Sequence, residues 1–360
     1  MKLQKKVPVR PTFFFMLSLV ALALLSAFLK LPLYLIGVAL TVCICARYTN
    51  VMLSLLLSIA SSFFAGSGIM YVLNSVDYEI LFFMAVVGSL TASVLRSIGE
   101  SYNPPSILFG TAMVMWLFDS FHYQVPPLNI AIALIFALSA GYTAHRMSVI
   151  DTSGVLSGTL IGVLIIIFTD VKWFLLLLSF LVLGGIFTKY KYEFKRTLGI
   201  AQRTRGYKNV FGNALCALAM AIAFRFHPVF SVGFLGAVAT ATSDTLATEI
   251  GETYKKEPLL ITTLERVPAG TSGAISLLGE ISALLSSALI ALLAILLGFN
   301  MFSMRVILIA TVVGGFLGTH VDSLLGATLE RRKILDNHMV NLLSTVFGAL
   351  VSMGVYFMVS

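Results

Sequence analysis

Long apolar runs are the feature that most constrains the fold of this chain. They follow one another along nearly its whole length and are separated by short stretches that carry most of the charged residues. A helix needs about 20 apolar residues to cross the hydrocarbon core of a bilayer. The sequence is 58% hydrophobic and only 11% charged, a composition outside the range of soluble domains. We predict an all-α integral membrane protein with no soluble domain.

About 13 of these runs are candidates for transmembrane helices. The run at 105–118 is short and bounded by Pro105 and Asp119, so it could re-enter the membrane without crossing it, which would lower the number to about 12. No small-residue cleavage site follows the first run, so we expect a retained helix and not a signal peptide. The predicted spans are 12–29, 32–46, 51–74, 79–95, 105–118, 127–144, 154–169, 172–188, 209–224, 229–248, 274–298, 305–326 and 338–358.

The distribution of Lys and Arg predicts the orientation, because short cytoplasmic loops retain these residues. With a cytoplasmic N-terminus, alternation of the spans leaves only Lys30, Lys172, Arg225 and Arg305 outside, out of 24 Lys and Arg in total. We therefore expect a multi-pass protein of the cell membrane with its N-terminus in the cytoplasm. Topology and anionic lipid headgroups account for the net charge of +8, so we expect no nucleic-acid partner.

The character of the chain changes near residue 146. Residues 1–145 are rich in Leu, Phe and Val and poor in buried carboxylates, which suits an N-terminal transmembrane scaffold. In residues 146–360, small and polar residues recur at the predicted cytoplasmic ends of the spans, so we expect the functional site there. Glycines four apart, such as Gly314 and Gly318, let helices approach closely, either within one chain or between the chains of a homodimer.

Three acidic residues stand beside hydroxyl residues at the predicted cytoplasmic ends of spans. This weak internal repeat predicts that three acids lie at one membrane level, although they are far apart in the sequence. The three positions are Asp151 before Thr152 and Ser153, Asp244 before Thr245, and Asp322 before Ser323.

Asp244 and Glu249 are carboxylates in or bordering a span, where a charge is costly unless it is paired, hydrated or bound to a cation. Mg²⁺ is the natural cation, because it takes one or two carboxylates together with phosphate oxygens and water. Five residues of helix turn the chain well past one revolution, so these two acids share a face only if the helix frays before Gly251. Helix capping or interhelical hydrogen bonding is the structural alternative. Asp322 could be a further metal ligand.

The loop from Pro268 to Gly273 precedes a long predicted span. Glycine backbone and free N–H groups at a helix start can cradle a phosphate, so we expect Gly270, Thr271, Ser272 and Gly273 to bind one. Thr271 or Ser272 would equally well cap the helix without any ligand. The loop is not a Walker A motif, because no GKS or GKT follows the glycines.

The loop 189–208 is the most basic in the chain, and Glu193 is its only acid. Membrane topology and lipid headgroups explain part of this charge, and screening of phosphates would explain the rest. Farther on, Asn337 and Asn341 could bind a nucleotide, a phosphate or a neighbouring helix. The basic residues that could screen phosphates are Lys195, Arg196, Arg203, Arg205 and Lys208.

Six ordered motifs between 146 and 358 resemble the multi-span membrane family that contains the plant phytyl-phosphate kinase and its archaeal, bacterial and eukaryotic relatives. Residues 1–145 match no motif of this family. The motifs are DTSGVLSGTLIG (151–162), KYKYEFK with GIAQ and RGYKNVFGN (189–213), SDTLATEIG (243–251), EPLLITT with VPAGTSGAISLLG (257–279), VDSLLGATL (321–329) and NHMVNLLSTVFGAL (337–350).

The resemblance implies transfer of a phosphoryl group from a nucleoside triphosphate, with CTP the expected donor, to an isoprenoid monophosphate such as phytyl or geranylgeranyl phosphate. A prenyl tail stays in the bilayer and a nucleotide arrives from the cytosol, so the site must lie at the cytoplasmic interface. We expect Mg²⁺ on Asp244, Glu249 or Asp322, with catalytic charge from Lys195 and Arg205. The residues expected to contact nucleotide or phosphate are Arg203, Lys208, Asn209, Asn337, Asn341 and the loop 270–273.

A secondary transporter of an ion or organic anion is the alternative from another class, because membrane acids and glycine-broken helices also build transport sites. Such sites lie near the bilayer midplane, and by this reading Glu280 is the deepest acid. The CDP-alcohol phosphotransferases also join lipids to cytidine nucleotides, but their paired DxxDG signature is missing from this sequence. A purely structural scaffold would leave the ordered polar motifs without a purpose.

Overall fold

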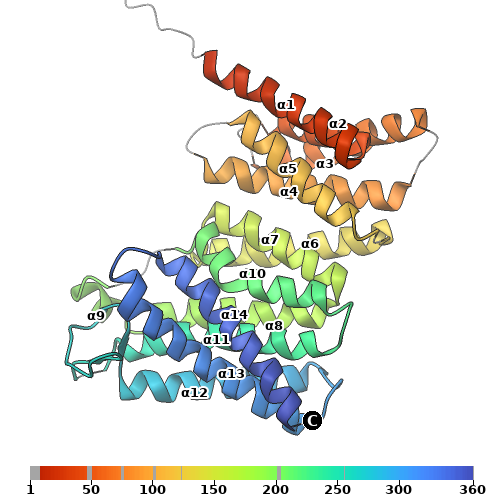
Figure 1. Ribbon diagram of the computed structural model, residues 1–360. Coiled ribbons are helices and arrows are strands. Elements are labelled where there is room, and N and C mark those ends of the chain that lie inside the picture. Colours follow the sequence, from red (N-terminus) through yellow and green to blue (C-terminus); the bar gives the residue numbers. More distant parts are fainter. Residues whose placement is uncertain are drawn as a thin grey trace, which may run out of the picture. The chain divides into compact units, whose positions relative to one another are not determined.

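The computed structural model describes residues 9–46, 51–73, 77–99, 103–122, 124–200, 204–254 and 256–359. The described chain is almost entirely helical (Figure 1). It divides into two compact units, one made of residues 1–141 with 155–160 and the other of residues 142–154 with 161–360. The domain boundary predicted between residues 145 and 146 stays a prediction.

The first unit is a bundle in which α4 packs against α2, α3 and α5. Local signals start its helices: the Asp77 carboxylate accepts hydrogen bonds from two backbone N–H groups at the start of α4, and Asn103 caps α5 just before Pro104. The helices of this unit are α1 (Val9–Leu29), α2 (Leu33–Cys45), α3 (Val51–Val72), α4 (Tyr78–Ile98), α5 (Pro104–Asp119) and most of α6 (Pro127–Arg146).

The second unit is built around α11 (Val229–Gly251), which packs against α8, α10, α12, α13 and α14. The remaining helices of this unit are most of α7 (Thr152–Phe168), α8 (Val171–Lys189), α9 (Tyr192–Thr197), α10 (Tyr207–Ala223), α12 (Leu277–Leu296), α13 (Met304–Leu325), the π-helix η1 (Gly326–Glu330) and α14 (Asn337–Val359).

Small residues allow the close packing around α11. A Cβ atom on Gly314 of α13 would lie 2.6 Å from the carbonyl oxygen of Gly348 on α14. A Cβ atom on Gly236 of α11 would lie at the same distance from that oxygen. The backbones of three helices therefore approach more closely than any side chain would permit, as the glycine spacing predicted for α13.

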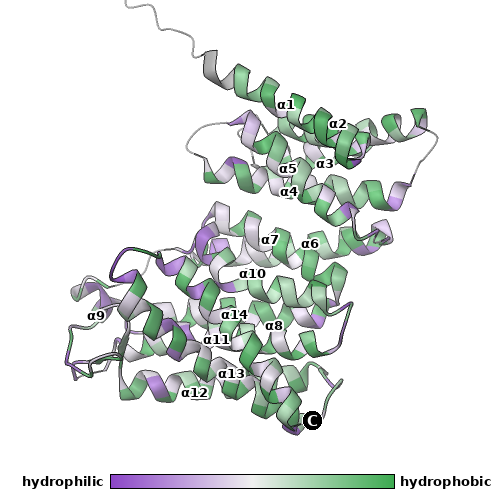
Figure 2. Cartoon of the chain, viewed as in Figure 1, coloured by the Kyte–Doolittle hydropathy of each residue, from purple (hydrophilic) through white to green (hydrophobic). Residues whose placement is uncertain are grey.

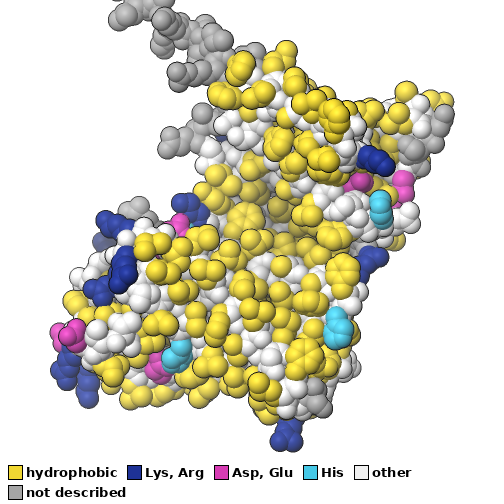
Figure 3. All heavy atoms as spheres, in the orientation of Figure 1, with side chains coloured by type: hydrophobic (Ala, Val, Ile, Leu, Met, Phe, Trp, Pro, Cys, Tyr) yellow, Lys and Arg dark blue, Asp and Glu magenta, His cyan; other side chains and the backbone are white. Residues whose placement is uncertain are grey.

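Polar residues concentrate at one end of the second unit. Figure 2 shows hydrophilic residues around α9 and hydrophobic ones along the helix middles. In Figure 3 most of the viewed surface of this unit is hydrophobic, and Lys and Arg gather at the end that carries α9. At the other end, the buried Trp173 ring lies 4.6–5.2 Å from the rings of Phe224, Phe234 and Phe299.

Eight of the described helices are long and apolar enough to cross a membrane. The prediction of a mostly helical protein with several spans is confirmed, whereas the number of 12–13 spans and the cytoplasmic N-terminus stay predictions. The eight are Leu53–Val72, Tyr78–Ile98, Pro127–Arg146, Val171–Lys189, Val229–Gly251, Leu277–Leu296, Met304–Glu330 and Asn337–Val359.

The segment between α11 and α12 differs from the prediction of a loop that leads directly into a span from residue 274. It forms a small antiparallel sheet of β1 (Leu259–Leu260) and β2 (Ala274–Ile275). Gly270 and Gly273 have φ values of +81° and +79°, which glycine adopts at little cost where the chain reverses. Ser276 is extended and its hydroxyl accepts a hydrogen bond from the Gly279 N–H, so α12 begins at Leu277.

Candidate functional site

The site begins where the basic loop docks beside α7. The backbone around Arg205 pairs in parallel with residues 149–151: its N–H donates to the Val149 carbonyl and its carbonyl accepts from the Asp151 N–H, both at 3.0 Å. These bonds fix the backbone of Arg205 and therefore the point from which its side chain extends.

Asp151 and Ser153 hold this arrangement together. The Asp151 carboxylate accepts from the Ser153 hydroxyl at 2.6 Å and from the Gly154 N–H at 2.9 Å. The Ser153 hydroxyl in turn accepts from the Tyr207 N–H at 3.0 Å. A Cβ atom on Gly206 would lie 2.8 Å from the Asp151 carboxylate. Asp151 and Ser153 thus join two of the sequence motifs through hydrogen bonds. Thr152, which lies between them in the sequence, is exposed in the first turn of α7.

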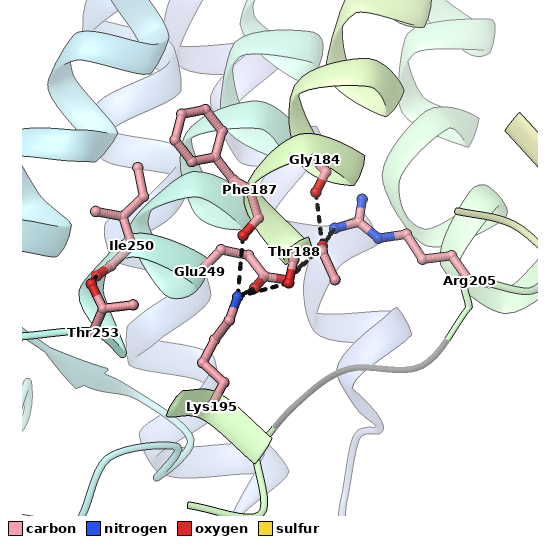
Figure 4. Close-up of polar contacts among 8 residues, drawn as sticks. All are labelled: Gly184, Phe187, Thr188, Lys195, Arg205, Glu249, Ile250 and Thr253. Carbon is pink, nitrogen blue, oxygen red and sulfur yellow. Dashed lines mark hydrogen bonds and ion pairs between the residues drawn. The ribbon is translucent and has the colours of Figure 1, made fainter. Parts of the chain in front are cut away.

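Lys195 and Glu249 form a buried ion pair, and each side chain is only 1% exposed (Figure 4). Besides Glu249, the Lys195 ammonium donates to the carbonyl oxygens of Phe187 at 3.1 Å and Thr188 at 3.0 Å. An ammonium group has three donors, so all of them are occupied. Lys195 anchors α9 to the ends of α8 and α11, and its catalytic role stays a prediction.

Arg205 reaches the same carboxylate from the other side. One guanidinium nitrogen, Nη2, donates to the Thr188 hydroxyl at 3.2 Å and lies 4.0 Å from Glu249. The Thr188 hydroxyl donates to Glu249 Oε1 at 2.7 Å. The other terminal nitrogen, Nη1, is buried without a hydrogen-bond partner. Burial lowers the pKa of the Arg205 guanidinium, while Glu249 and then Asp244 raise it.

Asp244 and Asp322 come together from α11 and α13, and their side chains hydrogen-bond to each other. The Ser344 hydroxyl of α14 also donates to Asp322, at 2.9 Å. Glu330 and Arg205 lie within electrostatic range of Asp244. Two adjacent carboxylates repel each other when both are charged, and this repulsion is relieved by a shared proton or a bound cation. The pair of Asp244 and Asp322 is called the acid pair below.

Two asparagines connect the acid pair to α10. With its amide oriented to satisfy both atoms, Asn341 donates to the Asn337 carbonyl at 2.9 Å and to Asp322 at 3.3 Å, and accepts from Asn213 at 3.2 Å. Asn213 also donates to the Asn209 carbonyl at 2.9 Å. Asn341 therefore takes part in interhelical bonding, one of the two roles that the sequence left open, whereas Asn209 accepts from Asn213 within α10. Asn213 was not predicted, although its spacing of four from Asn209 places the two on one helix face.

The loop 268–273 packs against the end of α13. The Ser272 hydroxyl bonds to the Glu330 carboxylate, and the Thr271 hydroxyl donates to the Pro268 carbonyl at 2.7 Å. A Cβ atom on Gly273 would lie 2.5 Å from the Ser323 carbonyl oxygen. Thr271 and Ser272 do not cap α12, because Ser276 does. Sequence reasoning also missed Glu330, whose place on a π-helix, a feature common at functional sites, is not visible in the sequence.

The predicted metal ligands fall into two groups. Helix α11 continues to Gly251 without fraying, so Asp244 faces Asp322 whereas Glu249 faces Lys195. Among the residues that the structure describes, no three His, Cys, Asp or Glu side chains lie at metal-binding distance. Both Glu249 oxygens have protein partners, and the expectation that Glu249 could hold the metal stays a prediction.

Three further residues singled out from the sequence lie at the starts of helices. Lys208 is exposed in the first turn of α10, and Asn337 is exposed at the start of α14. Arg203 lies outside the described residues. Glu280 lies in the first turn of α12, not two turns into the span as the sequence suggested, and its carboxylate is 3.0 Å from His320 Nε2.

The sequence matches one protein family and several known membrane proteins. The model of the family described as integral membrane protein DUF92 matches residues 135–349. An uncharacterised membrane protein of Methanocaldococcus jannaschii is 35% identical over 64% of this chain and 94% of its own length. Protein VTE6, chloroplastic, of Arabidopsis thaliana is 31% identical over 61% of this chain and 68% of its own length. No solved structure matches.

Proposed function

Because this chain belongs to the integral membrane protein family DUF92, we propose that it is a prenyl-phosphate kinase. The family indicated by the six ordered motifs is confirmed, and the chain is a multi-pass integral membrane protein. In the proposed reaction, CTP donates its γ-phosphoryl group to an isoprenoid monophosphate such as phytyl or geranylgeranyl phosphate. The site would face the cytoplasm from the cell membrane.

The observation that carries this proposal is the separation of charge within the site. The acid pair of Asp244 and Asp322, with Glu330 nearby, forms a negative pole. Arg205, which has an unpartnered buried donor, forms a positive pole within electrostatic range of Asp244. A phosphate accompanied by a divalent cation complements both poles, because its oxygens suit the guanidinium and the cation suits the carboxylates.

The donor set of the acid pair fits Mg²⁺. Mg²⁺ prefers one or two carboxylates and completes its shell with phosphate oxygens and water. Asp244 and Asp322 would hold the ion, which when bound neutralises charge on the donor phosphates. Ser344 and Asn341 orient the Asp322 carboxylate through their hydrogen bonds, as outer-shell groups do for metal ligands.

Phosphoryl transfer requires the protein mainly to position the two substrates and to offset their negative charge. The attacking oxygen belongs to the acceptor monophosphate and is already ionised, so no general base is needed. A new bond forms between that oxygen and the γ-phosphorus of CTP, and the bond from this phosphorus to the β,γ-bridging oxygen breaks. The products are a prenyl diphosphate and CDP. Arg205, and Lys208 at the surface, would offset the repulsion between the two anions.

The test is transfer of labelled γ-phosphate from CTP, ATP, GTP or UTP to geranylgeranyl or phytyl monophosphate by the detergent-purified protein with Mg²⁺. We expect labelled prenyl diphosphate, with CTP the best donor. Absence of product with every pair, from protein that remains folded, would refute the kinase. Uptake of an organic anion into proteoliposomes without nucleotide would then support a transporter.

Substitution of the acid pair sharpens this test. Asp244→Asn and Asp322→Asn should each lower the rate by roughly 100-fold or more, because a metal contact contributes several kcal/mol to the transition state. Asp336→Asn is the matched control: Asp336 is exposed and caps α14 through the Met339 N–H, a role that Asn also fills. Full activity in Asp244→Asn would remove Asp244 from the mechanism.

A further inference from the structure

Residues 189–198, here called the α9 segment, bury a single side chain. Helix α9 within it has only six residues, and of these only Lys195 is buried. A helix shorter than about 12–15 residues is marginal in water, because its own hydrogen bonds barely offset the cost of ordering it. The other side chains of α9 are open to whatever surrounds this end of the second unit.

Large apolar side chains make up much of the exposed surface of the α9 segment. Tyr190, Tyr192, Phe194 and Leu198 are 41–48% exposed. Single exposed apolar side chains are ordinary on protein surfaces, whereas several close together mark a site of contact with a protein or a membrane. Tyrosine is typical of the membrane interface, where its ring meets the acyl chains and its hydroxyl reaches water.

Basic residues alternate with these apolar ones. Lys189, Lys191 and Arg196 are exposed, and Glu193 is the only acid of the α9 segment. Lys and Arg gather at this end of the unit in Figure 3. Anionic headgroups above acyl chains complement such a mixture of positive and apolar side chains. A soluble anion would match the charge but would leave the apolar side chains uncovered.

The exposed face of α8 leads directly into the α9 segment. Val182 and Ile186 are 51% and 55% exposed, on a helix that is long and apolar enough to cross the membrane. Lys189, the last residue of α8, is exposed and lies three residues after Ile186, which itself lies four after Val182. This spacing places the three on one face of the helix. In a bilayer that face contacts lipid, so the α9 segment begins beside lipid.

The chain then turns back to the end of α8. Lys191 has a φ value of +49°, a left-handed turn immediately before α9. The Lys195 ammonium donates to the carbonyl oxygens of Phe187 and Thr188 and pairs with Glu249 (Figure 4). Helix α9 therefore stays at the level where α8 ends, which in a bilayer is the level of the headgroups.

We propose that the α9 segment is a membrane anchor that binds anionic lipid headgroups. Its four exposed apolar side chains lie at the boundary of the acyl chains, and Lys189, Lys191 and Arg196 attract the headgroups. The anchor holds α9 in the position from which Lys195 reaches Glu249. The proposal does not depend on the kinase reaction, so the two stand or fall separately.

The first experiment locates α9 relative to the bilayer. Phe194→Cys is labelled with a fluorophore and placed in nanodiscs that contain a lipid with a nitroxide near its headgroup; the native cysteines are buried. Lys256→Cys is the control, because Lys256 is exposed just after the end of α11, which Lys195 contacts through Glu249. We expect the nitroxide lipid to quench the label at 194 much more strongly than the label at 256.

Quenching at 194 that is no stronger than at 256 would overturn the proposal. Quenching at 194 by iodide in solution, without quenching by the nitroxide lipid, would do the same. In that case the α9 segment faces water, and its surface fits an acidic protein partner better than the bilayer.

The second experiment tests the preference for anionic lipid. Binding of phosphatidylglycerol and of phosphatidylcholine to the detergent-purified protein is measured by native mass spectrometry. The double variant Lys191→Gln and Arg196→Gln should bind phosphatidylglycerol roughly tenfold or more weakly, because each basic residue at a membrane surface favours anionic lipid. Its binding of phosphatidylcholine should stay unchanged.

Lys256→Gln with Lys333→Gln is the matched control for this second experiment. It removes the same charge from exposed positions that follow α11 and η1, and it should bind phosphatidylglycerol like the unmodified protein. An equal loss in both double variants would show that only net charge matters, and no loss in either would show that the α9 segment binds no anionic lipid. Either result refutes the anchor.

Discussion

At the scale of single residues, the buried charges of the second unit separate into a structural network and a reactive pair. Lys195 and Glu249 satisfy each other and tie α9 to α8 and α11. Such a pair adds little stability of its own, but loss of one partner leaves an uncompensated charge in the interior. The acid pair and Arg205 are the groups that remain available to a ligand.

Glu252 offers a test of the charge around this network. It follows the end of α11, and the pKa of its carboxyl is raised to about 7 from an ordinary 4.5. Burial is the largest cause of this rise and the charge of Glu249 is the next, whereas Lys195 acts in the opposite direction. Its Oε2 is buried without a hydrogen-bond partner. Between these two pH values the folded protein holds a proton that the unfolded chain has released, so stability falls as the pH rises toward 7.

We therefore expect Glu252→Gln to melt at a higher temperature than the unmodified protein at pH 8, with a gain on the order of 2 kcal/mol that shrinks as the pH falls toward 5. Thermal unfolding in detergent across this pH range measures the effect. Glu193→Gln is the control, because that side chain is 79% exposed and pairs only with the exposed Arg196 in the described contacts. A pH-independent difference between Glu252→Gln and the unmodified protein would contradict the raised pKa.

Which residues carry charge at the membrane interface could be predicted from the sequence, but their partners could not. Asp244 and Asp322 were expected at one membrane level, and the structure brings them into contact. The pairing of Glu249 with Lys195 and the contact of Glu330 with Ser272 depend on how neighbouring helices rotate about their axes. Residues 54 and 58 positions apart in the chain have no local signal that would reveal such contacts.

At the scale of secondary structure, the start of α12 shows how a local cap competes with a glycine-rich loop. The sequence suggested a helix start near residue 274 with Thr271 or Ser272 as its cap. In the structure the residues before Ser276 pair as β2 with β1 instead, and the Ser276 hydroxyl accepts from the Gly279 N–H at 3.2 Å. The short sheet moves the helix start beyond the loop.

This arrangement predicts different effects for two hydroxyl deletions. Ser276→Ala should lower the stability of the protein by about 1 kcal/mol, the usual contribution of an N-cap. Thr271→Ala should change it little, because the Thr271 hydroxyl is exposed and donates only to the nearby Pro268 carbonyl among the described contacts. The melting temperatures of the two variants, measured in the same detergent, test this prediction. A larger decrease for Thr271→Ala than for Ser276→Ala would place the helix start where the sequence suggested.

At the scale of the whole molecule, helix lengths and loop charges make a topological prediction that stands apart from the chemistry. The segment between α11 and α12 and the segment between α12 and α13 lie at opposite ends of α12, which is long enough to span the membrane. With the N-terminus inside, the first segment is cytoplasmic and the second is external.

Cysteine labelling in intact cells tests this orientation. Lys256→Cys should resist a membrane-impermeant maleimide until the cells are opened, whereas Asn300→Cys should react at once; both positions are exposed. The native cysteines Cys43, Cys45 and Cys216 are buried and give a low background. The reverse pattern of labelling would invert the topology and put the proposed site on the outer face.

Length and hydrophobicity of the apolar runs, together with the placement of Lys and Arg, were enough to indicate a helical membrane protein and the region that holds its polar site. These are local properties, because the bilayer requires each span to be apolar and to satisfy its own backbone hydrogen bonds. The sheet before α12, the occupied donors of Lys195, the contact of Asp244 with Asp322 and the unpartnered nitrogen of Arg205 emerged only when the helices were packed. Each depends on the rotation and approach of segments distant in the chain, set by close contacts such as those of Gly236, Gly314 and Gly348.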